Sequence, residues 1–246
     1  MAFVTAPDGV KIHYEIEGDG PPLVLQHGLL SNLESWHHRG YVERLSPLFR
    51  LILVDSRGHG ESDKPDNQEA YELRTRVVDI ASVLNDLDIG QAHYLGYSMG
   101  CWMGYGGLIY MPQRFKSLTL GGFSPYTGPE VTFEDLAQAP GVQKNEIFAA
   151  SLDQFPHAMK HSLNELRRWG GAEQALRTTD RPMLLFAGTE DPNNAAQGMQ
   201  TATVSSKDAT FFPIDGADHG GAADAVDVVA PRVIDFVQQV EAAGGR

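Results

Sequence analysis

The sequence predicts an α/β protein built on a doubly wound, mostly parallel sheet. Short apolar runs recur along the chain, and segments with helical spacing lie between them. Continuously apolar strands are typical of a parallel sheet that helices cover on both faces. Strands that alternate with helices indicate a doubly wound topology. With 246 residues, the chain is long enough for one large domain with a sizeable core.

The predicted strands begin with a hairpin. Residues 3–5 and 10–16 flank Pro7-Asp8-Gly9, which is a strong turn signal. Six apolar runs follow as candidate core strands, at residues 22–26, 51–54, 92–95, 117–120, 183–187 and 210–214. Each run leads toward a turn or a helix, as a doubly wound sheet requires.

Three segments that follow these strands have helical character. In residues 71–87 the apolar side chains recur at helical spacing. Residues 98–110 and 225–240 are predicted as two further helices. We expect these helices to cover the faces of the sheet.

Residues 124–180 interrupt this alternation. They contain helical segments at 133–137, 145–155 and 157–169, which are separated by Pro140 and Pro156. We interpret the region as a short helical insertion that forms a small cap over the strand ends. The predicted organisation is therefore a core of residues 1–123 and 181–246 with a cap of residues 124–180.

Composition and charge argue against several classes of protein. The chain is 42% hydrophobic and 21% charged, which is ordinary for a globular protein. The formal net charge of −13 disfavours nucleic acids and anionic membranes as partners. No stretch approaches the roughly 20 apolar residues that a membrane span requires. We therefore expect no nucleic-acid and no membrane partner.

The N-terminus and the cysteine content indicate the compartment. The first residues lack the basic and apolar regions of a signal peptide. Cys101 is the single cysteine, so no intramolecular disulfide can form. Both features fit a reducing compartment, and we expect a cytoplasmic protein.

The sharpest local signal is Gly96-Tyr97-Ser98-Met99-Gly100, which follows a predicted strand and opens a predicted helix. A Gly-x-Ser-x-Gly motif in that context is a nucleophile elbow. The serine sits on a strained turn that lifts its Oγ clear of the backbone. The helix N-terminus then points at developing negative charge. Ser98 is therefore the candidate nucleophile.

A serine hydroxyl needs a base to take its proton, and the base needs a third group to hold it. After such an elbow the acid and then the histidine follow along the chain. Of the later histidines, His157 and His161 lie in the insertion, whereas His219 lies in a small loop after the last predicted strand. His219 is the predicted base.

The acid is expected after the preceding strand. Residues 183–187 run into Gly-Thr-Glu-Asp-Pro, and Asp191 is the predicted acid. Glu190 and Asp218 remain competing candidates. The three residues Ser98, Asp191 and His219 occur in the required order at three strand ends.

A tetrahedral oxyanion needs two backbone N–H donors. One is expected from Met99, the residue after the nucleophile, and the other from Leu29 in the loop after residues 22–26. His27 is interpreted as a residue that braces this loop. Leu30 and Tyr97 are the predicted substrate-binding residues. The adjacent histidines His37 and His38 do not form a metal pattern, so no metal site is predicted.

Taken together, these motifs resemble the α/β-hydrolase superfamily, and specifically its small capped serine esterases and hydrolases. The resemblance covers almost the whole chain. Its five blocks, in the family's order, are residues 27–28, 55–62, 96–100, 188–191 and 216–219. Block 55–62 reads Asp-Ser-Arg-Gly-His-Gly-Glu-Ser, similar to the family's Asp-x-Arg-Gly-x-Gly-x-Ser loop.

The resemblance implies a core of about eight strands with an inserted cap, and acyl transfer to water without a cofactor. The expected activity is that of a carboxylesterase acting on a small-molecule ester. A serine at position 98 argues against the dehalogenases and epoxide hydrolases of the family, which use aspartate. Gly220 stands where some carbon–carbon bond hydrolases carry a bulky aromatic residue, which weakens that alternative.

Other reactions of the same triad stay open. They are those of a lactonase, a thioesterase, a carbon–carbon bond hydrolase of dienone acids and a cofactor-free perhydrolase. A carboxylate substrate would need a cationic side chain, for which Arg167 and Arg168 are the adjacent candidates in the cap. A small-molecule receptor on a hydrolase scaffold is an alternative of a different class. A homodimer through the cap or an edge strand is also left open.

Overall fold

The computed structural model describes residues 2–244, and its centre is an eight-stranded sheet with the order β1-β2-β4-β3-β5-β6-β7-β8. The strands are β1 (Ala2–Thr5), β2 (Lys11–Glu17), β3 (Pro22–Gln26), β4 (Arg50–Val54), β5 (Ala92–Tyr97), β6 (Phe115–Gly121), β7 (Met183–Gly188) and β8 (Ala209–Ile214). The predicted doubly wound, mostly parallel sheet is confirmed.

The strands of the sheet run in one direction except for β2, which runs against both of its neighbours. The predicted hairpin forms, since β1 pairs antiparallel with β2, and β2 pairs antiparallel with β4. From β4 onward every neighbouring pair is parallel. The carboxyl ends of β3, β5, β7 and β8 therefore lie at one edge of the sheet, where α/β folds place their ligands.

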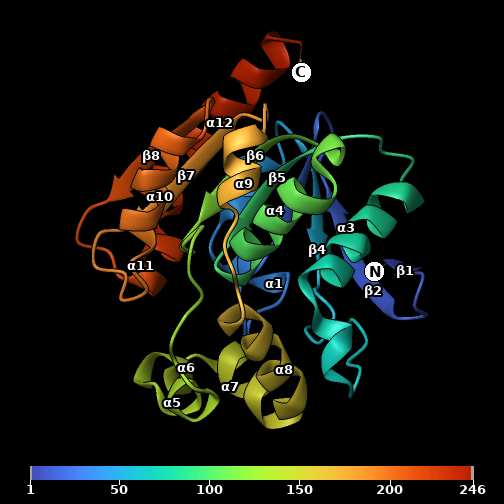
Figure 1. The fold of residues 1–246 in the computed structure, drawn as a ribbon. Coiled ribbons are helices and arrows are strands. Elements are labelled where there is room, and N and C mark those ends of the chain that lie inside the picture. The colour runs from blue at the N-terminus through green and yellow to red at the C-terminus, as the bar shows by residue number, and fades with distance from the viewer. Residues whose placement is uncertain (1, 245–246) are drawn as a thin grey trace.

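Helices cover both faces of this sheet (Figure 1). One core cluster includes side chains of α3 (Leu73–Asp86), α4 (Met99–Tyr110), α9 (Glu173–Thr178) and α10 (Ala195–Ser205). The cluster on the other face includes side chains of α1 (Glu34–His38), α2 (Tyr41–Leu45), α11 (His219–Asp224) and α12 (Val226–Ala242). Every residue of β5 and β7 is buried, as expected for central strands of a covered sheet.

The chain between β6 and β7 forms the cap helices α5 (Phe133–Gln138), α6 (Pro140–Lys144), α7 (Glu146–Gln154) and α8 (Pro156–Arg167), followed by α9. Figure 1 shows α5 to α8 at one end of the sheet, whereas α9 returns to the core beside α4. Leu176 of α9 belongs to the core cluster under that face. The region predicted as a cap at 124–180 thus contains four helices that lie at the end of the sheet, α5 to α8, and one helix that packs on the core, α9.

Apolar and polar contacts join the cap to the core. Leu30 and Tyr71 of the core form one buried cluster with cap side chains that include Val142 and Met159. Beside this cluster, the fully buried Arg76 of α3 donates a hydrogen bond from Nη2 to Ser162 Oγ of α8, at 2.5 Å. The cap is therefore anchored on Leu30 after β3 and on the stretch of the core from Tyr71 to Arg76.

The sequence patterns miss several short helices. They predict neither α1 and α2, which have five residues each, nor α6, α9, α10 and α11. Within residues 2–244, none of the helices is both long and apolar enough to cross a membrane.

The glycines of the elbow allow β5 and α4 to pack closely. A Cβ at Gly100 would lie 2.0 Å from the carbonyl oxygen of Gln26 at the end of β3. A Cβ at Gly96 would lie 2.4 Å from the carbonyl oxygen of Gly100. Both obstacles are backbone atoms, so neither can move aside cheaply.

We expect Gly100→Ala to lower the free energy of unfolding by at least about 2 kcal/mol, because the added methyl group overpacks a rigid junction. Urea unfolding followed by circular dichroism measures the change. Gly90→Ala is the matched control, since a Cβ there meets nothing within 4 Å. Equal unfolding midpoints for the two variants would contradict this account of the elbow.

Candidate active site

The structure brings Ser98, Asp191 and His219 together at the carboxyl edge of the sheet. Ser98 Oγ lies 3.0 Å from His219 Nε2. On the other side of the ring, His219 Nδ1 lies 2.7 Å from Asp191 Oδ2. The three side chains form a continuous relay of hydrogen bonds with the geometry of a nucleophile, a base and an orienting acid.

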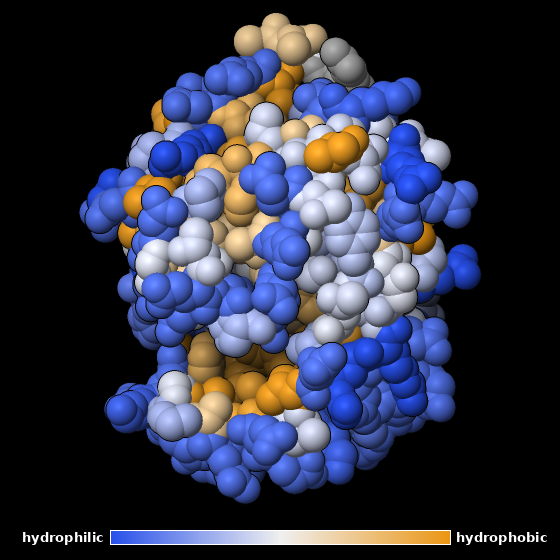
Figure 2. Space-filling view, turned by 60° about the vertical axis from the view of Figure 1, so that its left-hand side comes forward, coloured by the Kyte–Doolittle hydropathy of each residue, from blue (hydrophilic) through white to orange (hydrophobic). Residues whose placement is uncertain are grey.

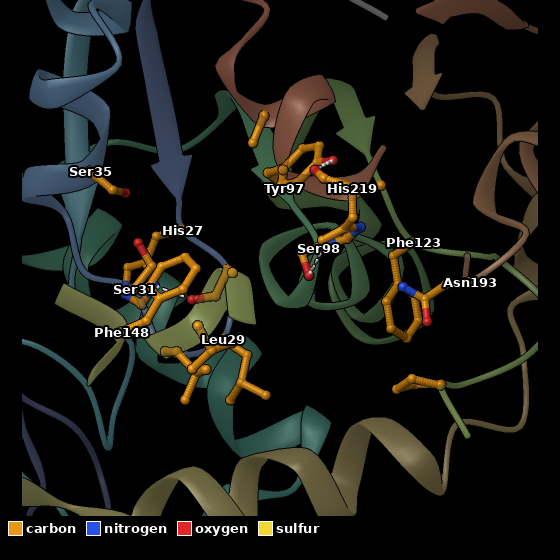
Figure 3. A pocket seen from close by; sticks show the side chains of 18 of the residues that line it. His27, Leu29, Ser31, Ser35, Tyr97, Ser98, Phe123, Phe148, Asn193 and His219 are labelled. Carbon is orange, nitrogen blue, oxygen red and sulfur yellow. Dashed lines mark hydrogen bonds between the residues drawn. The ribbon is translucent and has the colours of Figure 1, made fainter. Parts of the chain in front are cut away.

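Ser98 occupies a strained turn between β5 and α4. Its backbone has φ 56° and ψ −115°, and it is the N-cap residue of α4. A non-glycine residue with positive φ is uncommon and costs about 1–3 kcal/mol when the surroundings hold it in place. The strain turns the hydroxyl out of the sheet and into the cavity, as Figure 3 shows.

Asp191 lies in the loop after β7 and is buried. Burial by itself would raise the pKa of Asp191, but the hydrogen bond and charge of His219 and the bonds from Asn193 more than offset it, so the pKa is lowered. The Asn193 backbone N–H donates to Asp191 Oδ1 at 2.9 Å. Asp191 is therefore an ionised acceptor at neutral pH, with one oxygen left for His219.

His219 opens the short helix α11 and is held by Tyr97 of the elbow. The Tyr97 hydroxyl donates to the backbone carbonyl of His219 at 2.6 Å, and the two rings lie 5.2 Å apart. Burial raises the pKa of Tyr97 well above its ordinary value, so the phenol stays a neutral donor. Tyr97 thus holds the backbone of His219 in position beside Ser98.

Two backbone N–H groups remain for an oxyanion. Within residues 2–244, neither Leu29 N–H nor Met99 N–H donates a hydrogen bond to the protein. Met99 is the first residue of α4, where N–H groups have no partner inside the helix. The turn of residues 27–29, called the oxyanion turn from here on, packs directly on Ser98, because a Cβ at Gly28 would lie 3.2 Å from Ser98 Cβ.

Both ring nitrogens of His27 form hydrogen bonds that brace this turn. Its Nε2 accepts a hydrogen bond from the Ser56 backbone N–H at 3.1 Å. Its Nδ1 lies 2.8 Å from the carbonyl oxygen of Gly28, to which it donates. Burial lowers the pKa of His27, which favours the neutral ring that this arrangement needs. The structure therefore places His27 as a bracing residue beside the site.

A cavity of about 480 Å³ lies above the nucleophile. Figure 2 shows the surface hollowed between the core and the cap, with hydrophobic residues inside and hydrophilic residues around the rim. Figure 3 shows Ser98 and His219 at its centre, between Phe148 and Leu29 on one side and Phe123 and Asn193 on the other. No group of three or more His, Cys, Asp or Glu side chains in the described chain is arranged to hold a metal ion.

The predicted substrate-binding residues Leu30 and Tyr97 both line this cavity. Leu30 also has a positive φ of 65° and packs into the cluster that anchors the cap. In contrast, Arg167 and Arg168 do not reach the cavity, and they line a separate depression beside Gly128. They therefore do not supply a cation to the nucleophile.

Among the residues that line the cavity, Asn193 and Arg39 are absent from the sequence predictions. Asn193 follows the Asp191-Pro192 pair, so its proximity to the acid could have indicated it. Arg39 lines the cavity from the end of α1. No local motif marks Arg39, because its neighbour Asp224 lies near the other end of the chain.

The comparison with protein families identifies the class. The model of the alpha/beta hydrolase fold family matches residues 21–160, which is more than half of the chain. The chain therefore belongs to the alpha/beta hydrolase fold family.

Individual relatives differ in their named activities. A 2-(acetamidomethylene)succinate hydrolase of Mesorhizobium japonicum is 33% identical over 121 residues, which is 49% of this chain and 42% of that protein. The bifunctional epoxide hydrolase 2 of Sus scrofa is 30% identical over 117 residues, which is 47% of this chain and 21% of that protein. The chain thus matches less than half the length of these relatives.

Solved structures share the fold over nearly the whole chain. An esterase from Exiguobacterium antarcticum superimposes with a TM-score of 0.82, covering 96% of this chain and 99% of that one at 21% identity. At this identity the likeness shows the architecture alone.

We expect Tyr97→Phe to lower kcat about three- to tenfold with a smaller change in KM, because one hydrogen bond that positions His219 is lost. Steady-state kinetics on an activated ester measures both constants. Tyr126→Phe is the matched control, since the Tyr126 hydroxyl has no hydrogen-bond partner in residues 2–244. An equal effect of both variants, or a loss confined to KM, would contradict the positioning role of Tyr97.

Proposed function

We propose that this chain is a serine hydrolase that cleaves a small carboxylic ester through an acyl-enzyme intermediate. The observation that carries the proposal is the hydrogen-bonded series from Ser98 through His219 to Asp191. It is supported by the backbone N–H groups of Leu29 and Met99 beside Ser98, which donate no hydrogen bond to residues 2–244. A nucleophile, a base, an acid and oxyanion donors are the complete set that acyl transfer requires.

The proposed reaction begins with the ester carbonyl over Ser98 Oγ. His219 Nε2 takes the hydroxyl proton as Oγ attacks, and Asp191 stabilises the imidazolium. The oxyanion accepts hydrogen bonds from the N–H groups of Leu29 and Met99, each of which is worth about 3 kcal/mol of barrier. The alcohol leaves with the proton from His219, and water then repeats the sequence on the acyl enzyme.

The cap side of the cavity favours an apolar acyl group. Its lining there includes Leu136, Val142, Phe148, Leu163 and Leu166. Apolar surface of this kind binds alkyl or aryl groups by removing them from water. A cavity of about 480 Å³ suits a small ester better than a long-chain lipid.

The identity of the residue at the elbow favours ester hydrolysis over epoxide hydrolysis. One relative is named an epoxide hydrolase, and the family resemblance assigns an aspartate nucleophile to that chemistry. This chain has Ser98 at the elbow instead. The hydrolysis of lactones, thioesters or carbon–carbon bonds would use the same three residues, so the ester is the proposal and these bonds are its alternatives.

We expect wild-type protein to release p-nitrophenol from short-chain and medium-chain esters, and Ser98→Ala to lose turnover by at least about 10³-fold because the attacking oxygen is removed. The measurement is the initial rate of absorbance increase for each chain length. Circular dichroism of Ser98→Ala is the control for folding.

Equally slow release of p-nitrophenol by wild type and Ser98→Ala would contradict the serine mechanism. Saturable binding of the ester without product would instead support a receptor on this scaffold. If wild type alone turns over, the chain-length preference measures the acyl pocket.

We expect Asp191→Asn to lower kcat by roughly 10³–10⁴-fold near neutral pH, because the amide cannot orient and stabilise the imidazolium as a carboxylate does. The lowered pKa of Asp191 keeps the carboxylate ionised down to pH values below its ordinary range, so this loss should persist across the neutral range. Glu190→Gln is the matched control, as Glu190 is exposed one residue earlier and does not line the cavity. A larger loss from Glu190→Gln would transfer the acid role to Glu190.

A further inference from the structure

The cavity has a polar side that the proposed reaction does not use. This side runs between α1 and α11, and Ser35, Arg39, Tyr41 and Asp224 line it. The cap side, in contrast, is mostly apolar. A cavity with one apolar and one polar side fits a substrate that carries a polar group at one end.

Arg39 is the only arginine or lysine among the described residues that lines this cavity. Its side chain is 22% exposed, and its Nε donates to Asp224 Oδ1 at 2.8 Å. Within residues 2–244, its two terminal nitrogens, Nη1 and Nη2, donate no hydrogen bond. A guanidinium presents five N–H donors in a rigid fork that matches a carboxylate, so most of this fork remains for a ligand.

The ion pair with Asp224 does not neutralise the positive charge that Arg39 presents to the cavity. Asp224 is 67% exposed, whereas Arg39 is 22% exposed. The positive group is therefore the less exposed member of the pair, and its partner lies mostly in water, where its field is screened. The other acid on the cavity lining near α11, Asp218, is the N-cap of that helix and accepts a hydrogen bond from Gly221 N–H.

Arg44 shows that an ion pair between these neighbouring segments does not by itself place a cation in the cavity. Arg44 of α2 pairs with Asp227 of α12, close in sequence to the Arg39–Asp224 pair. Arg44 is 51% exposed, however, and does not line the cavity. Both ion pairs join the α1–α2 segment to the α11–α12 segment. Of the two arginines, Arg39 also lines the cavity and Arg44 does not.

The polar side adjoins the reacting groups. The helix α11 begins at His219 and ends at Asp224, so one helix carries the base at its first residue and the partner of Arg39 at its last. Five helical steps span about 8 Å along the axis. Tyr97, which holds His219, lines the same cavity. Because Arg39, Ser98 and His219 line one cavity of about 480 Å³, we expect a small ester to contact Arg39 and Ser98 together.

We propose that the terminal nitrogens of Arg39 form an anion subsite that binds a carboxylate carried by the ester substrate. This inference rests on the proposed ester hydrolysis and names its substrate class, a small ester with one ionised carboxyl group a few bonds from the scissile carbonyl. The charge-assisted bonds orient the substrate with its apolar part under the cap.

Isosteric ester pairs test the subsite. In the first pair the two esters differ in the leaving group. 4-Carboxyphenyl butyrate carries a carboxylate there, and 4-carbamoylphenyl butyrate carries a neutral amide. In the second pair the acyl group carries the charge, as the mono-4-nitrophenyl ester of adipic acid beside that of adipamic acid. For each pair the readout is the ratio of kcat/KM for the carboxylate to that for the amide, measured for wild type, Arg39→Gln and Arg44→Gln.

We expect Arg39→Gln to lower this ratio about tenfold or more in at least one pair, because a charge-assisted hydrogen bond is lost only for the carboxylate. The pair that responds shows which end of the ester carries the charge. Arg44→Gln removes a charge from the same region and should leave both ratios within twofold of wild type. A fall of less than fivefold with Arg39→Gln in both pairs, or an equal fall with Arg44→Gln, overturns the subsite.

A measurement on wild type alone covers the case in which Arg39→Gln does not fold. Competitive inhibition of 4-nitrophenyl butyrate hydrolysis by 4-hydroxybenzoate and by 4-hydroxybenzamide compares the same two groups as products. With a subsite that serves the leaving group, the inhibition constant of the benzoate is at least fivefold lower. For the acyl group, adipate and adipamate are compared in the same way, and equal constants in both comparisons overturn the proposal.

The two proposals fail differently. If 4-nitrophenyl butyrate is not hydrolysed, or if Ser98→Ala hydrolyses it as fast as wild type, the ester mechanism fails. If the neutral esters turn over through Ser98 while the ratios do not respond to Arg39→Gln, the anion subsite alone fails.

Discussion

The backbone conformation of Ser98 is the constraint on which the rest of the site depends. Its positive φ at the junction of β5 and α4 is unfavourable for a residue with a side chain. The junction is held because Gly100 lets α4 approach the end of β3 until a Cβ would overlap the carbonyl of Gln26. The same approach sets the free N–H of Met99 beside the oxyanion turn. One strained residue therefore positions both the proposed nucleophile and one of its two proposed oxyanion donors, the N–H of Met99.

The buried carboxylate of Asp55 holds the other half of the site. Burial by itself would raise the pKa of Asp55, but the hydrogen bonds that this carboxylate accepts, first of all from His13, lower it overall. An ionised carboxylate with this many donors fixes the loops that supply them. The donors are Leu33 N–H at 2.8 Å, Glu61 N–H at 2.9 Å and His13 Nδ1 at 2.8 Å. The block of residues 55–62 thus ties the segment that contains Leu33 to the sheet, and none of its residues lines the cavity at Ser98.

Local signals are enough to find the sheet and the three central residues. Ser98, Asp191 and His219 each follow a continuously apolar strand by a few residues. Because parallel strands end at one edge of a sheet, residues far apart in the chain meet there. Short helices give weaker signals. The helix α10 is rich in Ala, Thr and Gln and has little apolar periodicity, and α1 and α2 are too short for any period to show.

The charges that face the cavity depend on packing between distant segments, which no local pattern contains. Arg167 and Arg168 attract attention because they are adjacent in the cap, yet the end of α8 directs them to another depression. Arg39 is unremarkable in sequence, and it reaches the cavity because α1 packs beside α11 on the same face of the sheet. The proposed reaction chemistry therefore follows from strand ends, whereas the proposed selection of a charged substrate follows from which arginine the packing leaves open to the cavity.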